Sequence, residues 1–101
     1  MRYCFDLDGT LCEQTENYAA ATPFEDRIAV VNKLHDEGNT IIIETARGSM
    51  SGQNWEPLTA YQLREWGVKY HELRAGTKIA ADVYVDDKCL SPESFFGMHL
   101  D

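Results

Sequence analysis

Two acidic segments, one near each end of the chain, are the residues best suited to chemistry. Asp6-Leu7-Asp8-Gly9-Thr10 ends a run of aromatic and apolar residues, and Asp86-Asp87 directly follows Val83-Tyr84-Val85. If folding brings the four carboxylates together, each like-charge pair at about 4 Å costs roughly 4 kcal/mol at an effective dielectric near 20. Such a cluster requires a cation or shared protons. Because all the donors are oxygen atoms, the sequence predicts Mg²⁺ as the cofactor.

Short strands must position these acids. Three segments share an apolar run that ends in polar residues: Tyr3 to Leu7, Ile41 to Ile43, and Val83 to Val85. In open parallel α/β sheets, ligands bind outside the carboxyl ends of the strands, so we expect Asp6, Thr45 and Asp86 to face one crevice. Either acidic segment alone is equally consistent with a turn or a solvated loop, because Asp and Gly are ordinary turn residues. The combination favours a site.

Further residues are candidates to bind an anionic substrate. Thr45 carries a hydroxyl that can donate to a phosphoryl oxygen, and Lys78, eight residues before Asp86, can reach back into the crevice. The charge of Lys78 would offset both the acids and the phosphate. We expect Arg47 and Gly9 to contact the substrate, Arg47 through an anionic group. Taken singly, Thr45 is an ordinary strand-end residue and Lys78 an ordinary surface lysine, so their order along the chain carries the argument.

The order of these residues resembles the haloacid dehalogenase superfamily. The motifs of that family are Asp-x-Asp-Gly-Thr, a strand-end Thr or Ser, a Lys and an acidic pair, and the corresponding residues here are Asp6 to Thr10, Thr45, Lys78 and Asp86-Asp87. The resemblance implies an α/β fold, a minimal Rossmann-like three-layer sandwich with a mainly parallel sheet in the order 4-1-2-3. It also implies a single phosphatase domain without a cap, spanning residues 1–101.

The resemblance assigns a role to each motif residue in a phosphomonoester hydrolase. Asp6 is the nucleophile that forms an aspartyl-phosphate. Asp8 protonates the leaving group and later accepts a proton from water. Thr45 and Lys78 hold the phosphoryl oxygens. Lys88 is a rival for the lysine role, but the family's lysine lies upstream of the acidic pair, which favours Lys78.

The resemblance also implies the metal ligands. Mg²⁺ is expected on the carboxylates of Asp6 and Asp86 and on the backbone carbonyl of Asp8, where it stabilises charge in the transition state. Asp87 is expected to support the metal through water or to orient the lysine. The two acidic segments would then form one metal site.

Family members often carry a cap domain, for which this chain has no room. Residues 11–21 suffice only for a small flap and residues 48–56 only for a loop, so we expect an open active site, one that a second copy of the chain could cover. The run Glu44-Thr45-Ala46-Arg47-Gly48 also looks like that of small bacterial and phage members, some associated with surface-polysaccharide clusters. A sugar phosphate or polysaccharide precursor is therefore one candidate substrate.

Composition narrows the class of protein. A chain of 101 residues forms one domain with a modest core. The net charge of −8 argues against a nucleic-acid groove. No apolar stretch approaches the roughly 20 residues of a membrane span, and Asp6 interrupts the N-terminal run too early for a signal peptide. Three cysteines at spacings that match no zinc motif indicate reduced thiols, and we expect a cytoplasmic protein.

Helical patterns fill the intervals between the strands. Thr22-Pro23-Phe24-Glu25 predicts a helix start with Thr22 as N-cap, and Gly38 predicts its end. A second helix is expected from Pro57 to Trp66, with Leu58, Tyr61 and Trp66 on or near its buried face. Val68 to Leu73 predicts an edge strand, and Ser91-Pro92-Glu93 begins a short terminal helix.

Two other classes remain open at this point. A phosphoacceptor module of the response-regulator type uses similar residues, but its acidic pair belongs on the first strand and its phosphorylated Asp on a middle strand. Here Asp86-Asp87 follows the last strand, and Ile43-Glu44 occupies the middle one. The second alternative is a non-catalytic binding or assembly module. A phosphatase assay with and without Mg²⁺ separates these classes.

Overall fold

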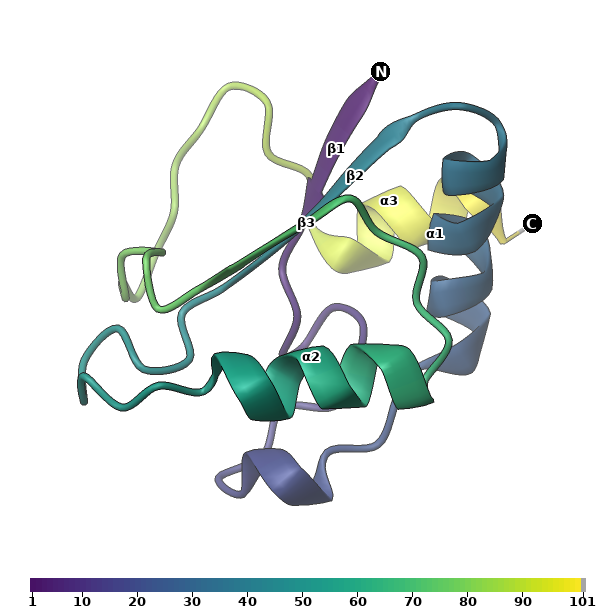
Figure 1. Ribbon diagram of the computed structural model, residues 1–101. Helices are drawn as coiled ribbons and strands as arrows, with labels where there is room; N and C mark the ends of the chain where they lie inside the picture. Colours follow the sequence, from purple (N-terminus) through teal and green to yellow (C-terminus); the bar gives the residue numbers. More distant parts are fainter. Residues whose placement is uncertain (101) are drawn as a thin grey trace.

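Strands and helices alternate along the chain in the computed structural model, which describes residues 1–100 (Figure 1). The elements in order are β1 (Arg2–Phe5), a 3₁₀ turn η1 (Tyr18–Ala20), α1 (Glu25–Asp36), β2 (Thr40–Thr45), α2 (Glu56–Glu65), β3 (Glu72–Ala75) and α3 (Pro92–His99). The three strands form one parallel sheet in the order β1-β2-β3. The α/β class and the parallel sheet are confirmed. β3 lies at the sheet edge as expected, but it begins at Glu72 and not at Val68.

The helices cover one face of this sheet. Phe5, Ile41 and Ile43 point to that face and join the core, whereas Cys4 on the opposite face is exposed. Successive crossovers that add strands in the same direction turn the same way, which places α1 and α2 together. In Figure 1, α3 lies on this side as well, and the loop after β3 lies on the other. Within residues 1–100 the architecture has two layers, so the expected three-layer sandwich is wrong.

The predicted fourth strand is a loop. Val83 is 73% exposed and Val85 is 94% exposed, and neither pairs with β1. The Tyr84 side chain turns back onto its own loop, where its hydroxyl donates to the Ile79 carbonyl and accepts from the Ala81 N–H. The sheet order 4-1-2-3 is therefore not formed among the described residues, and one edge of β1 stays unpaired.

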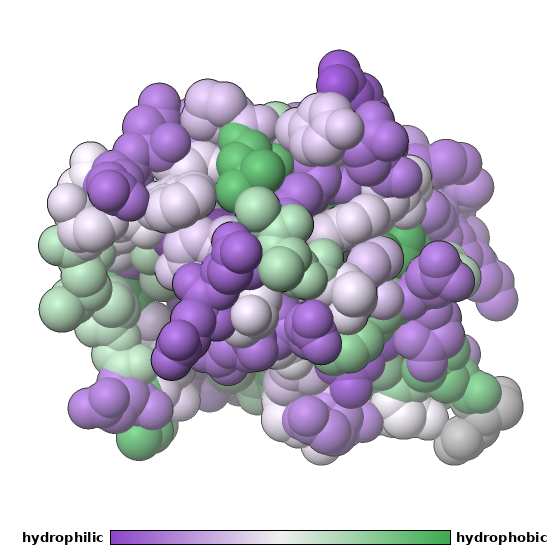
Figure 2. All heavy atoms as spheres, turned by 90° about the horizontal axis from the view of Figure 1, so that it is seen from below, coloured by the Kyte–Doolittle hydropathy of each residue, from purple (hydrophilic) through white to green (hydrophobic). Residues whose placement is uncertain are grey.

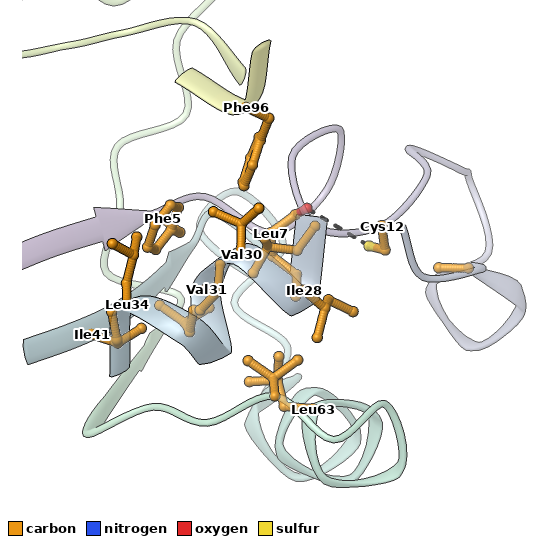
Figure 3. Packing of buried hydrophobic residues seen from close by; sticks show 14 residues of the cluster. Phe5, Leu7, Cys12, Ile28, Val30, Val31, Leu34, Ile41, Leu63 and Phe96 are labelled. Atoms are coloured by element: carbon orange, nitrogen blue, oxygen red, sulfur yellow. Dashed lines mark hydrogen bonds between the residues drawn. The ribbon is translucent and has the colours of Figure 1, made fainter. Parts of the chain in front are cut away.

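The core lies beneath the carboxyl ends of β1 and β2. Figure 3 shows Phe96 of α3 on one side of the cluster and Leu63 of α2 on the other, with Leu7 and the α1 residues between them. Leu7 is fully buried, and burial of a Leu side chain contributes about 1.5–3 kcal/mol. Because Leu7 points inward, it anchors the chain between Asp6 and Asp8, whose carboxylates remain partly exposed.

Local signals set some helix ends and not others. Ser91 caps α3 as predicted, since its hydroxyl accepts from the Ser94 N–H at 3.1 Å. Helix α1 begins at Glu25, three residues after the predicted cap, because Pro23 forms an antiparallel bridge with Cys12. In α2 the buried residues are Thr59, Gln62 and Leu63, so the expectation that Tyr61 faces the core is wrong.

The surface over the lower elements of Figure 1 is mostly hydrophilic. Seen from below, its hydrophobic residues form small separate groups (Figure 2). No helix within residues 1–100 is long and apolar enough to cross a membrane.

Candidate functional site

A pocket of about 320 Å³ opens at the carboxyl ends of β1 and β2. Four predicted residues line it together, namely Asp6, Asp8, Thr45 and Lys78. The remaining lining residues are Gln14, Thr15, Tyr18, Ala46, Ala80, Ala81 and Tyr84. The first and second strands thus deliver their polar ends to one crevice, as the strand pattern predicted.

A glycine turn follows β1 and carries Asp8. Gly9 adopts a φ of 83°, a left-handed conformation that glycine adopts without steric cost. The Leu7 carbonyl accepts from the N–H groups of both Thr10 and Leu11, which closes the turn beneath Asp8. The Gly9 N–H donates to the Cys12 carbonyl at 2.8 Å, and Gly9 does not line the pocket. Gly9 is therefore a turn residue here, and its contact with the substrate stays a prediction.

Lys78 supplies positive charge beside Asp6. Its Nζ lies 3.3 Å from Asp6 Oδ1 and 4.7 Å from the centre of the Tyr84 ring. The Ser49 hydroxyl donates to the Lys78 backbone carbonyl, which ties the loop after β3 to the loop after β2. Lys88, the rival for the lysine role, is exposed and lies outside the pocket lining. Lys78 is therefore the lysine that the fold places at the site.

Asp8 is bound by a buried arginine. Arg47 Nε and Nη2 donate to the two carboxylate oxygens of Asp8 at 2.9 and 2.8 Å. Arg47 Nη1 donates to Thr59 at 3.2 Å and to Gln62 at 2.7 Å, and the guanidinium lies 4.5 Å from the centre of the Tyr18 ring. Such two-pronged, charge-assisted pairs are stronger than neutral hydrogen bonds and fix orientation.

This network corrects the role expected of Arg47. Its side chain has no exposed surface and is absent from the pocket lining, so it does not bind an anionic group of the substrate. The guanidinium instead fixes the orientation of the Asp8 carboxylate, which is 16% exposed and lines the pocket.

Cys12 packs against the same acid. Its Sγ lies 3.5 Å from Asp8 Oδ1 and 3.7 Å from the Leu7 carbonyl oxygen, the contact drawn in Figure 3. Burial, reinforced by the negative charge of Asp8, raises the pKa of the Cys12 thiol to about 12. The thiol is therefore protonated at neutral pH and acts as a donor to Asp8, not as a nucleophile.

The second acidic segment lies away from the pocket. Asp86 and Asp87 are exposed and do not line it. The Lys88 N–H donates to Asp86 at 2.8 Å, and this hydrogen bond lowers the pKa of Asp86. Among residues 1–100, no three His, Cys, Asp or Glu side chains are close enough to hold a metal ion. In this arrangement the donor set does not fit Mg²⁺, because the strand expected to carry Asp86 to the crevice is a loop.

Sequence reasoning missed the flap residues of the pocket. Gln14, Thr15 and Tyr18 lie in the segment for which length alone predicted a flap. The flap is held in place because Gln62 donates to the Tyr18 carbonyl at 2.6 Å and Trp55 packs edge-on against the Tyr18 ring at 4.9 Å. No spacing in the sequence connects these residues, since the contacts join separate parts of the chain.

Comparison with known proteins supports the fold. No family model and no curated protein matches the chain. A crystal structure of a structural-genomics target from Vibrio cholerae is similar to it, with a TM-score of 0.83 and 28% sequence identity. The similarity covers 93% of this chain and 85% of the other. The name of that protein states no activity, so the likeness carries the architecture and not a function.

Proposed function

We propose that this protein is a phosphomonoester hydrolase that works through an aspartyl-phosphate on Asp6. One observation carries the proposal: a partly exposed carboxylate at the end of β1 lies 3.3 Å from the Lys78 ammonium, with Thr45 in the same pocket. This combination offers a nucleophile, a cation and a hydroxyl donor at the place where parallel α/β sheets bind ligands. The resemblance of the motif order to haloacid dehalogenases supports the same reaction.

In the first step, an Asp6 oxygen attacks phosphorus, the bond from phosphorus to the leaving oxygen breaks, and Asp8 gives that oxygen a proton. Lys78 and Thr45 stabilise the charge on the phosphoryl oxygens. The Thr45 hydroxyl oxygen already accepts the Arg47 backbone N–H at 3.1 Å, which leaves the hydroxyl hydrogen free to donate. In the second step, water attacks phosphorus, its proton passes to Asp8, and the bond between phosphorus and Asp6 breaks to regenerate the carboxylate.

The Mg²⁺ requirement remains a prediction, and neither step above depends on the metal. We propose that Val83 to Val85 can pair with the free edge of β1, which would complete the 4-1-2-3 order and bring Asp86 toward the pocket. Two features support this rearrangement: the exposed β-branched side chains of the segment, and the unpaired backbone groups that an edge strand presents.

The decisive experiment is acid-quenched intact-mass measurement during turnover of an aryl phosphate, with Mg²⁺ and with excess EDTA. We expect turnover and a phosphorylated protein, both lost in Asp6→Asn and retained in Asp36→Asn, which removes an exposed carboxylate bonded to Lys69. Full turnover in EDTA would contradict the Mg²⁺ requirement alone. Phosphate mapped to Asp8 or Asp86 would contradict the nucleophile.

The same measurement separates the two alternative classes. A phosphorylated protein that does not turn over would favour a phosphoacceptor signalling module. The absence of both phosphorylation and turnover would favour a non-catalytic binding module. The structure offers no observation that favours either alternative over the hydrolase.

A further inference from the structure

The pocket contains a single cation. Of its described lining residues, Asp6 and Asp8 are acidic, Lys78 is basic, and the others are uncharged. Lys78 already pairs with Asp6, and a substrate phosphoryl group would draw on the same ammonium. The one ammonium of the lining is therefore already shared between Asp6 and the phosphoryl group.

Within residues 1–100, no second cation lines the pocket. Arg47, which the sequence offered for this purpose, is buried and holds Asp8, Thr59 and Gln62. Another anionic group on the substrate would enter a pocket of two carboxylates without a partner, and like charges a few ångströms apart repel each other in a partly buried site.

The residues away from Lys78 favour neutral polar chemistry. Gln14 and Thr15 on the flap offer an amide and a hydroxyl, which both donate and accept hydrogen bonds. Tyr18 and Tyr84 add aromatic surface from the flap and from the loop after β3. Uncharged donors and acceptors beside aromatic rings suit a leaving group that carries hydroxyls and no charge.

We infer that the substrate is a phosphomonoester of a neutral, hydroxyl-rich group, with no second phosphate or carboxylate. The inference rests on the proposed hydrolase and names the substrate class of the same pocket. Bisphosphates, nucleoside polyphosphates and phosphorylated sugar acids would bind less well, because the pocket has no second cation for their additional anionic group. A neutral sugar or polyol monophosphate carries no such penalty.

The test compares matched substrates at constant Mg²⁺ and constant ionic strength. Sorbitol 6-phosphate and 6-phosphogluconate are both open chains that differ mainly by a carboxylate, and glucose 1,6-bisphosphate adds a second phosphate to glucose 6-phosphate. We expect kcat/KM for the neutral member of each pair to exceed that for the charged member by roughly tenfold or more, and the ratio to shrink as salt screens the repulsion. Equal or faster hydrolysis of the charged compounds would overturn the inference.

A second test changes the pocket in place of the substrate, by adding a positive charge to the flap. Thr15→Lys adds a second cation to the lining, and we expect the preference for the neutral substrate to fall toward unity. Thr15→Gln is the matched control, because it enlarges the side chain without charge and should keep the preference. An unchanged ratio in Thr15→Lys would overturn the inference.

The two proposals fail in different ways. Hydrolysis of an aryl phosphate through phospho-Asp6, together with no discrimination between neutral and charged sugar phosphates, would leave the hydrolase standing and remove the substrate class. Loss of both aryl phosphate turnover and the phosphorylated intermediate would remove the hydrolase and the substrate class together.

Discussion

The two acidic segments of this protein look alike in sequence and differ in their structural surroundings. Leu7, between the first pair of acids, is fully buried, whereas Val85, directly before the second pair, is 94% exposed. Asp8 is held by a buried guanidinium, whereas Asp86 is exposed and accepts a backbone N–H of its own loop. The first segment is part of the framework of the fold, and the second lies on its surface.

The difference shows what turns an apolar run into a strand. The first run pairs with β2 and packs its Phe5 ring against Phe96 of α3 at 6.0 Å between ring centres. The second run pairs with no strand within residues 1–100, and the hydroxyl of its Tyr84 bonds to two residues of its own loop. Strand propensity describes how well a side chain fits a pleated, half-buried surface, so it has no effect where no such surface forms.

The largest expected effect is a loss of turnover when Asp8, the partner of the buried Arg47, is changed. Asp8→Asn removes both the proton donor to the leaving group and the acceptor for the water proton, and we expect turnover to fall about 10² to 10⁴-fold. Because a good leaving group departs without a proton, the phosphorylated intermediate should still form from an aryl phosphate and should accumulate. Stopped-flow and acid-quench mass measurements test both points. Loss of the intermediate with such a substrate would show that Asp8 is also needed for the attack on phosphorus.

The next effect is on stability. Arg47→Leu leaves the Asp8 carboxylate without its partner, and breaking a buried ion pair in this way costs about 3–5 kcal/mol of unfolding free energy. Arg47→Lys keeps the charge and loses the two-pronged geometry, so its free energy of unfolding should lie between those of the leucine variant and the unmodified protein. Urea unfolding provides the measurement.

The control for this prediction is an exposed ion pair. Arg74 and Glu72 lie 2.9 Å apart at the surface, and we expect Arg74→Leu to leave unfolding unchanged, since exposed pairs contribute little. Equal costs for Arg47→Leu and Arg74→Leu would show that the Asp8 network does not support the fold.

Local chemistry made part of this molecule predictable. The parallel sheet, the Ser91 cap and the end of α1 before Gly38 follow from apolar runs and from single residues that act on their neighbours. The start of α1 was predicted two residues early because Pro23 pairs with Cys12, a contact outside the helix. Such bridges depend on the tertiary fold and leave no local signal.

The candidate site also contains residues that local sequence predicts and residues that depend on tertiary contacts. Asp6 and Thr45 could be placed because each ends a strand of a parallel sheet. Arg47 follows Thr45 closely and was expected at the substrate, but its partners Thr59 and Gln62 lie on α2 and Asp8 lies 39 residues earlier. Whether a charged residue binds a ligand or another part of the protein depends on contacts that spacing does not reveal.

The reactivity of the three cysteines also distinguishes the buried first segment from the exposed loop, and measuring it requires no change to the catalytic residues. Cys89 lies in the exposed loop and should react readily with a thiol reagent at pH 8, whereas Cys12 should react only on unfolding. Cys4 is exposed, but desolvation and the nearby Glu44 raise its pKa, so it should react more slowly than Cys89. Peptide mapping after timed labelling gives the three rates. Rapid labelling of Cys12 in the folded protein would mean that the turn beneath Asp8 opens.

Cys12 also gives a pH dependence with a definite sign. Its pKa is raised in the folded protein from 9.0 to about 12. A raised pKa means that the folded state binds the proton more tightly, so the stabilisation is complete below about pH 9.0 and is lost as the pH rises toward 12. The difference in unfolding temperature between the protein and Cys12→Ala should therefore be smaller at pH 10 to 11 than at pH 8.

The smallest effect is expected for Asp86→Asn. The pKa of Asp86 is lowered in the fold, so its contribution to stability is present above the ordinary value of 3.8 and is lost as the pH falls through the lowered one. Because the side chain is exposed and an Asn oxygen can also accept the Lys88 N–H, we expect no change in unfolding at pH 7 and the same stability as the unmodified protein in acid.

The same variant tests the comparison between the two acidic segments through activity. Asp82→Asn, in the same exposed loop, is the matched control. If Mg²⁺-dependent turnover falls in Asp86→Asn while unfolding and the control variant are unchanged, the loop must approach the pocket during the reaction, as pairing of Val83 to Val85 with β1 requires. If turnover and its Mg²⁺ dependence are unchanged, Asp86 is not a metal ligand. Hydrolysis then depends on Asp6, Thr45 and Lys78, the groups that the fold already holds together.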